Sequence, residues 1–134
     1  MTDTIFLATR QGVAICARQN DRWRVVDRVL WDQHVTSIIA REGVIMAGTT
    51  TGVQRSDDGG QHWQPRNAGL TSPRIRWLAY HPTISDLIFA GTEPAGIFVS
   101  RDGAEYWNAR PEVTTLRDEH DWMLPYSPEA GCVR

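Results

Sequence analysis

The chain of 134 residues is long enough for one modest domain, and 41% hydrophobic with 22% charged residues is ordinary globular composition. Fourteen Lys and Arg against sixteen Asp and Glu leave a formal net charge of −2, which supplies no positive field for phosphate backbones or anionic lipid. We therefore expect neither nucleic acid nor a membrane as a partner.

The beginning of the chain has no basic segment ahead of an apolar run, and Arg10 ends the first apolar stretch early. That run is too short for a signal peptide or a membrane span, so we expect a cytoplasmic protein. Cys16 and Cys132 have no Cys or His partner at zinc-ligand spacing. The sequence therefore predicts two idle thiols, no metal site and no cofactor.

Three segments repeat the same order of features. Each begins with a short apolar run, continues with a Gly-Val or Gly-Ile pair, and reaches a tryptophan eleven residues after that glycine. The runs are Ile5–Thr9, Ile45–Thr49 and Ile88–Thr92, and the tryptophans are Trp23, Trp63 and Trp107. A repeat of forty to forty-four residues is typical of one β-propeller blade.

Within a period the apolar runs are rich in β-branched and aromatic residues and are separated by Gly, Asp, Asn and Pro, which favours strands over helices. We predict an all-β partial β-propeller, a single domain over 1–134 with about three blades of four-stranded antiparallel sheet. The blades cover about 4–28, 35–66 and 74–110, with outer strands over 62–65 and 106–110 in the second and third, and a long connecting loop over 111–132.

The first repeat begins at a second strand, so the inner strand of its blade must come from elsewhere. Fewer than three complete blades are present, and four is about the minimum for a closed propeller. Two explanations stay open. The chain is part of a longer repeat protein, or several copies close a ring together as a homo-oligomer.

Two octets, 56–63 and 100–107, share the pattern Ser-x-Asp-x-x-x-x-Trp. The spacing suits a tight hairpin in which the aspartate accepts backbone N–H groups, the serine adds a hydroxyl bond and the tryptophan packs between sheets. We interpret them as structural rather than as calcium loops, which place more oxygen ligands at alternating positions. The structural residues are Ser56, Asp58, Gly60, Trp63, Ser100, Asp102 and Trp107.

These octets resemble the Asp-box, or BNR repeat, of sialidase-like, sortilin-like and photosystem II assembly-factor-like β-propellers. The resemblance implies that each box joins the third and outer strands of a blade. Sialidase-like activity would need an arginine cluster, a tyrosine nucleophile with a glutamate, and an aspartate acid, and none of these maps onto this sequence. Ala104 replaces the family's glycine, so its turn either takes negative φ or carries strain of about 1 kcal/mol.

The side opposite the boxes should carry any site, because blade connections and second-to-third turns gather there and functional residues concentrate on such loops. The ligand-binding candidates are Trp31, Asp32, His34, Arg74, Arg76, Glu93, Arg117 and Trp122. Arg74 and Arg76 point to one side of a strand. They form an anion-binding pair or, the reading that we favour, pair with Asp86, Glu93 or loop carboxylates.

The long connection holds the catalytic candidates. His120 lies among carboxylates, which could make it a general base or metal ligand oriented by Asp118 or Asp121. A solvated charge run is the alternative. The catalytic candidates are His120, Asp118, Glu119 and Asp121.

The sequence favours a non-enzymatic scaffold that binds a protein, peptide or carbohydrate through loops at the channel mouth. The alternative is a sialidase-like glycoside hydrolase that needs blades absent from this chain. Such an enzyme requires two carboxyl groups about 5 to 10 Å apart across a cleft.

Overall fold

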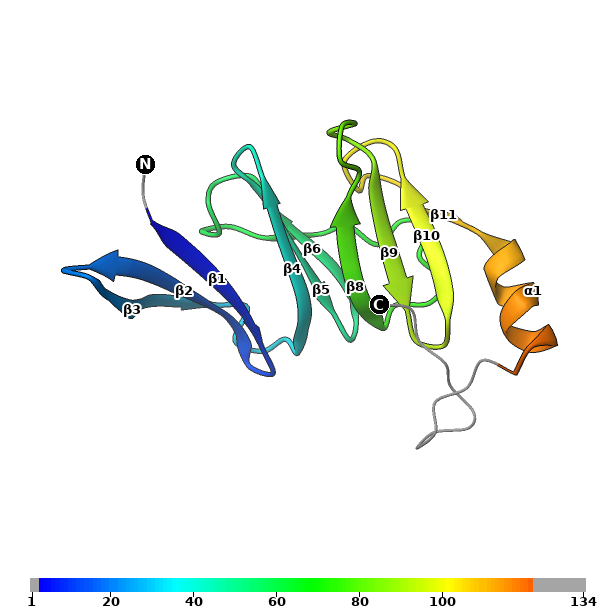
Figure 1. The fold of residues 1–134 in the computed structure, drawn as a ribbon, viewed down its shortest axis with the longest axis horizontal. Coiled ribbons are helices and arrows are strands. Elements are labelled where there is room, and N and C mark those ends of the chain that lie inside the picture. The colour runs from blue at the N-terminus through cyan, green and yellow to red at the C-terminus, as the bar shows by residue number, and fades with distance from the viewer. Residues whose placement is uncertain (1–2, 122–134) are drawn as a thin grey trace.

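The structure, a computed structural model, describes residues 3–121. These residues form three antiparallel sheets side by side and one helix (Figure 1). The first sheet contains β1 (Thr4–Thr9), β2 (Gly12–Gln19) and β3 (Arg22–Val29). The second contains β4 (Val35–Arg41), β5 (Val44–Thr49), β6 (Gly52–Ser56) and β7 (Gln64–Pro65). The third contains β8 (Ile75–Tyr80), β9 (Ile88–Thr92), β10 (Gly96–Ser100) and β11 (Asn108–Ala109), and α1 (Pro111–Glu119) follows.

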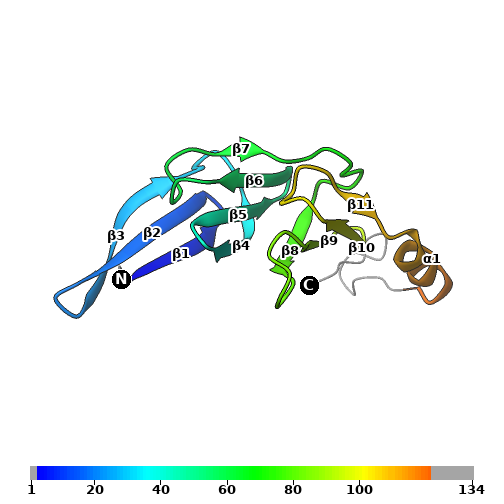
Figure 2. The ribbon, with the colours of Figure 1, turned by 90° about the horizontal axis from the view of Figure 1, so that it is seen from above.

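Each strand pairs with the next in sequence, which gives the meander of a propeller blade. Seen from above, β4 and β8 lie on the inner side of their sheets, and β7 and β11 lie on the outer side (Figure 2). The all-β propeller architecture predicted from the repeats is confirmed. The first sheet has three strands where the others have four, and β1 is its inner edge among the described residues.

Side-chain alternation along the strands builds a core between each pair of sheets. Val13 and Ile15 of β2 pack against Val35 and Ala47 of the second sheet. The second and third sheets share the larger core, whose buried members are Met46, Val53, Ile75, Leu78, Ile88, Ala90, Phe98, Ala104 and Trp107. Each sheet therefore buries one face against its neighbour, as stacked repeats do.

The prediction of a loop over the whole of 111–132 was wrong for its first part. Pro111–Glu119 is helical, with Pro111 in the first turn, Glu112 near the positive end of the helix dipole and Arg117 near the negative end. None of the helical residues is buried, so the segment has no broad apolar stripe of the kind that predicts a packed helix. The remainder, 122–132, lies outside the described residues.

The outer strands are shorter than expected. They were predicted over 62–65 and 106–110, but only Gln64–Pro65 and Asn108–Ala109 pair with a neighbouring strand. His62 and Tyr106 instead donate their backbone N–H groups to the box aspartates. The turn therefore takes two residues from the start of each outer strand.

Candidate functional site

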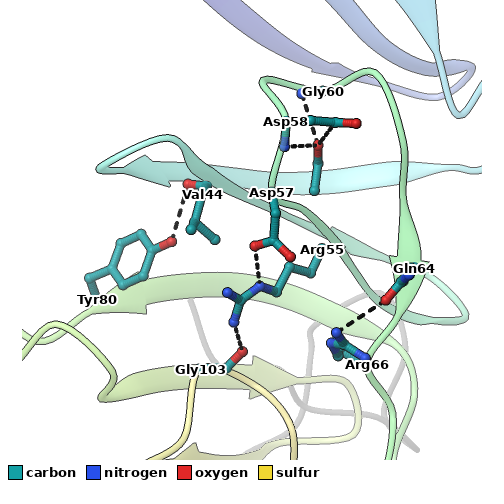
Figure 3. Close-up of polar contacts among 10 residues, drawn as sticks. Val44, Arg55, Asp57, Asp58, Gly60, Gln64, Arg66, Tyr80 and Gly103 are labelled. Atoms are coloured by element: carbon teal, nitrogen blue, oxygen red, sulfur yellow. Dashed lines mark hydrogen bonds and ion pairs between the residues drawn. The ribbon is translucent and has the colours of Figure 1, made fainter.

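The first Asp-box is a closed hydrogen-bonded turn between β6 and β7 (Figure 3). The Ser56 hydroxyl donates to Asp58 Oδ1 at 2.9 Å and accepts the Gly60 N–H at 2.8 Å. Asp58 Oδ1 also accepts the backbone N–H groups of Gln61 and His62, at 3.1 and 2.8 Å. The Trp63 indole N–H donates to the Gly60 carbonyl at 2.9 Å. The octet thus satisfies its own polar groups, as a structural turn requires.

The second box repeats this geometry without the glycine. Ser100 Oγ donates to Asp102 Oδ1 at 2.8 Å and accepts the Ala104 N–H at 2.8 Å. Ala104 adopts φ +74°, so of the two expected outcomes the strained one holds. Its methyl group is fully buried in the core, and that burial offsets part of the strain.

Hydrogen bonds to the box carboxylates favour their charged form. The backbone N–H of His62, followed by its side chain, lowers the pKa of Asp58 to about 2. The backbone N–H of Tyr106, followed by the Ser100 hydroxyl, lowers the pKa of Asp102. In the unfolded chain the pKa of an aspartate is about 3.9. The stabilisation is therefore present above that pH and is lost as the pH falls through the folded-state values.

We expect Asp58→Asn to be less stable than the natural chain at neutral pH but to lose less of its thermal stability between about pH 5 and pH 2.5. The reason is that asparagine cannot take up the proton that weakens the turn. Thermal unfolding by circular dichroism across that range measures the difference. Asp32→Asn is the control, since Asp32 is exposed and makes no side-chain hydrogen bond or ion pair within residues 3–121. An equally steep loss in Asp58→Asn and the natural chain would contradict the prediction.

The box side also joins the second and third sheets. Arg55 lies between them, donating to Asp57 Oδ1 at 2.8 Å and to the Gly103 carbonyl (Figure 3). Arg41 stacks over the ring of Tyr80 at 4.5 Å and donates to the His81 carbonyl at 2.7 Å. Burial is the main cause that raises the pKa of Tyr80. These arginines are used to hold the sheets together.

The opposite side carries an open cleft of about 420 Å³ to which all three sheets contribute. Arg10 lies in the β1–β2 turn, His34 precedes β4, and Arg76 is in β8. The side chains of Arg10 and His34 have no hydrogen-bond or ion-pair partner within residues 3–121. The remaining lining is Ala8, Thr9, Val35 and Thr36. We call this the mouth cleft.

Glu93 lies next to the mouth cleft and faces two arginines. Its carboxylate oxygens are 3.8 Å from Arg74 Nη1 and 3.7 Å from Arg76 Nε, and its side chain is only 14% exposed. The pairing favoured from the sequence is thus found, with Glu93 as the shared partner.

A second cleft of about 520 Å³ lies between α1 and the third sheet. Arg117 of α1 lines it, donating to the Ala95 carbonyl at 3.2 Å and to Asp118 Oδ1 at 2.8 Å. Hydroxyl side chains also line this cleft: Thr71 and Ser72 from the connection between β7 and β8, Thr92 from β9, and Thr114 and Thr115 from α1. We call it the helix cleft.

The remaining candidates are scattered. Trp31 and Asp32 are exposed on the connection between β3 and β4, and Trp31 is 75% exposed. His120 follows the last residue of α1, where its N–H donates to the Leu116 carbonyl, and Asp118 accepts a hydrogen bond from Arg117. Glu119 and Asp121 are exposed. Trp122 lies outside the described residues. Within 3–121, no cluster of three or more His, Cys, Asp or Glu residues is arranged to hold a metal.

Sequence reasoning missed Arg10. From the sequence it was interpreted only as the residue that ends an apolar run. In the repeat, however, it occupies the same position as Thr50 and Glu93, in the turn between the second and third strands of a blade. Those turns gather on one side of a propeller. The available signal was therefore its position in the repeat and not its immediate neighbours.

Comparisons with known proteins agree with the architecture. No protein-family profile matches the chain. A curated protein of Emericella nidulans, oligoxyloglucan-reducing end-specific xyloglucanase, is 29% identical over 85 residues, which is 60% of this chain and 10% of the xyloglucanase. In that stretch and in the fold, the chain is similar to Asp-box propeller proteins.

Two solved structures superimpose on 79% of this chain. One is YCF48 bound to D1 peptide, with a TM-score of 0.59 and 14% identity over 36% of that chain. The other is an ancestral GH74 enzyme, with a TM-score of 0.60 and 18% identity over 16% of that chain. The chain thus has the fold of propeller blades and spans little more than a third of YCF48 and about a sixth of the GH74 enzyme. Within residues 3–121, no helix is long and apolar enough to cross a membrane.

Proposed function

We propose that this chain is a non-enzymatic scaffold that binds an extended, acidic segment of a partner protein in the mouth cleft. The observation that carries the proposal is the convergence of Arg10, His34 and Arg76 from three different sheets on one open cleft. Turns held by a rigid stack of sheets are suited to binding, because little conformational entropy is lost when the ligand arrives.

The chemistry of the cleft favours an anion. Arg76 and Arg74 share the Glu93 carboxylate beside the cleft, while Arg10 and His34 line the cleft itself. Arginine binds carboxylates through a planar fork of N–H donors, and an acidic side chain on the ligand would meet the unpaired Arg10. The fold similarity to YCF48 bound to D1 peptide supports a peptide as the ligand class.

The second candidate is glycoside hydrolysis, favoured by the sequence similarity to the xyloglucanase and the fold similarity to the GH74 enzyme. A retaining or inverting mechanism needs one protonated and one ionised carboxyl group flanking the scissile bond. Glu93 pairs with two arginines, and Asp118 accepts a hydrogen bond from Arg117, so both carboxylates are already engaged by cations rather than free to flank a scissile bond. The scaffold is therefore the preferred proposal.

The test is fluorescence anisotropy with two labelled decapeptides, one with glutamate and one with lysine at alternate positions. We expect the acidic peptide to bind and the basic peptide not to, with an affinity that falls as salt is added. Arg10→Ala should weaken binding about tenfold, the value of one charge-assisted hydrogen bond.

Arg101→Ala is the matched control, because Arg101 is an exposed arginine in the second box, on the opposite side of the sheets. It should leave the affinity unchanged. Equal binding of both peptides, or equal loss in both variants, would count against the mouth cleft. Hydrolysis of xyloglucan oligosaccharides by the purified chain would instead support the enzyme.

A further inference from the structure

The first sheet exposes large apolar side chains on one face of its two edge strands, β1 and β3. Ile5 and Leu7 of β1 point away from Phe6, which packs towards the second sheet. Ile5, the buried Cys16 and Val25 are cross-strand partners on this face, and Trp23 lies two residues before Val25 on β3. Ile5 is 39% exposed, Leu7 47%, and Trp23 and Val25 48% each. We call these four side chains the leading face.

The same positions are buried in the other two sheets. Ile45 and Ile88 correspond to Ile5 and are 2% and 0% exposed. Ala47 and Ala90 correspond to Leu7 and are fully buried. In the second sheet the cover comes from the opposite face of the first, where Phe6, Val13 and Ile15 lie. The leading face is therefore built as a contact between sheets and lacks its cover among the described residues.

The matching cover is at the other end of the chain. Phe89 and Ile97 of the third sheet correspond to Met46 and Val53, which bury the third sheet against the second. Both are only partly buried. Beside them lies α1, which buries none of its residues and leaves the helix cleft lined by Ile97. We call Phe89 and Ile97 the trailing face.

We propose that two copies of this chain associate, with the leading face of each packed on the trailing face of the other. The described residues carry both halves of a sheet-to-sheet contact, one on the first sheet and one on the third, so a twofold pair forms two identical contacts. The resulting ring has six sheets, within the range of four to eight blades that propellers use. The arriving sheet has to displace α1, which buries no side chain and is tied to the third sheet by the hydrogen bond from Arg117 to the Ala95 carbonyl.

The experiment is size-exclusion chromatography with light scattering on the whole 134-residue chain over a range of concentrations. We expect a mass of about twice the 15.1 kDa of one chain. Leu7→Lys should raise the dissociation constant at least about tenfold, because it places a charge in an apolar contact. Trp31→Lys is the control, since Trp31 is 75% exposed on the connection between β3 and β4 and belongs to neither face, and this variant should stay dimeric.

A third variant distinguishes the proposed contact from a leading face packed on another leading face. Ile97→Lys alters only the trailing face and should also weaken the pair, with circular dichroism verifying that each variant is folded. A dimer that survives Ile97→Lys or Leu7→Lys would overturn the proposal. So would a monomer at every concentration, or growth beyond two chains, which indicates contacts that do not close.

Discussion

Trp107→Ala will lower the free energy of unfolding by about 3 to 5 kcal/mol, the range for removing a large buried aromatic side chain. Trp107 is 1% exposed and belongs to the core between the second and third sheets. Its indole N–H donates to the Arg66 carbonyl at 2.8 Å, so the substitution also leaves a partly buried acceptor without its partner. Urea unfolding with linear extrapolation measures the loss.

The control is Trp23→Ala, at the same position of the first repeat. Trp23 is 48% exposed, and in a monomer its removal should cost less than about 1 kcal/mol. Both substitutions are best compared in the Leu7→Lys background, which by the dimer proposal keeps the leading face uncovered. Similar costs for the two tryptophans would mean that the sheet-to-sheet contact is not what Trp107 stabilises.

The recurrent octets were enough to predict the turns and the stacking of sheets, because their structure is determined locally. The Ser56 and Asp58 side chains bond to backbone groups within four residues of themselves, so sequence spacing alone specifies the turn. The constant interval from glycine to tryptophan likewise indicates where each sheet meets its neighbour. The all-β propeller fold follows from these local rules.

The helix and the mouth cleft were harder to predict, because they depend on partners far apart in the chain. Nothing in the pattern of Pro111–Glu119 indicates a packed face, and its main tie is the bond from Arg117 to the Ala95 carbonyl. Arg10 and Arg76 share a cleft although sixty-six residues separate them. His120 attracted notice for its charged neighbours, but Asp118 pairs elsewhere.

Gly69→Ala will destabilise the chain by about 2 to 5 kcal/mol, through backbone strain and overpacking together. Gly69 adopts φ +86°, and a Cβ there would lie 2.0 Å from the Trp107 carbonyl oxygen. The neighbouring Ala68 carbonyl accepts the Trp107 N–H at 2.8 Å. An added methyl group must therefore push the connection between β7 and β8, which contains Gly69, away from the second box that this connection supports.

Gly43→Ala separates the two causes of that loss. Gly43 has a similar φ of +82°, but nothing lies within 4 Å of the added Cβ, so only the backbone term of about 1 to 2 kcal/mol should appear. The excess cost of Gly69→Ala over Gly43→Ala, measured by urea unfolding, is then the value of the close approach between neighbouring sheets. Equal costs would mean that backbone strain accounts for the whole effect. The close approach at Gly69 would then contribute nothing to holding the third sheet against the second.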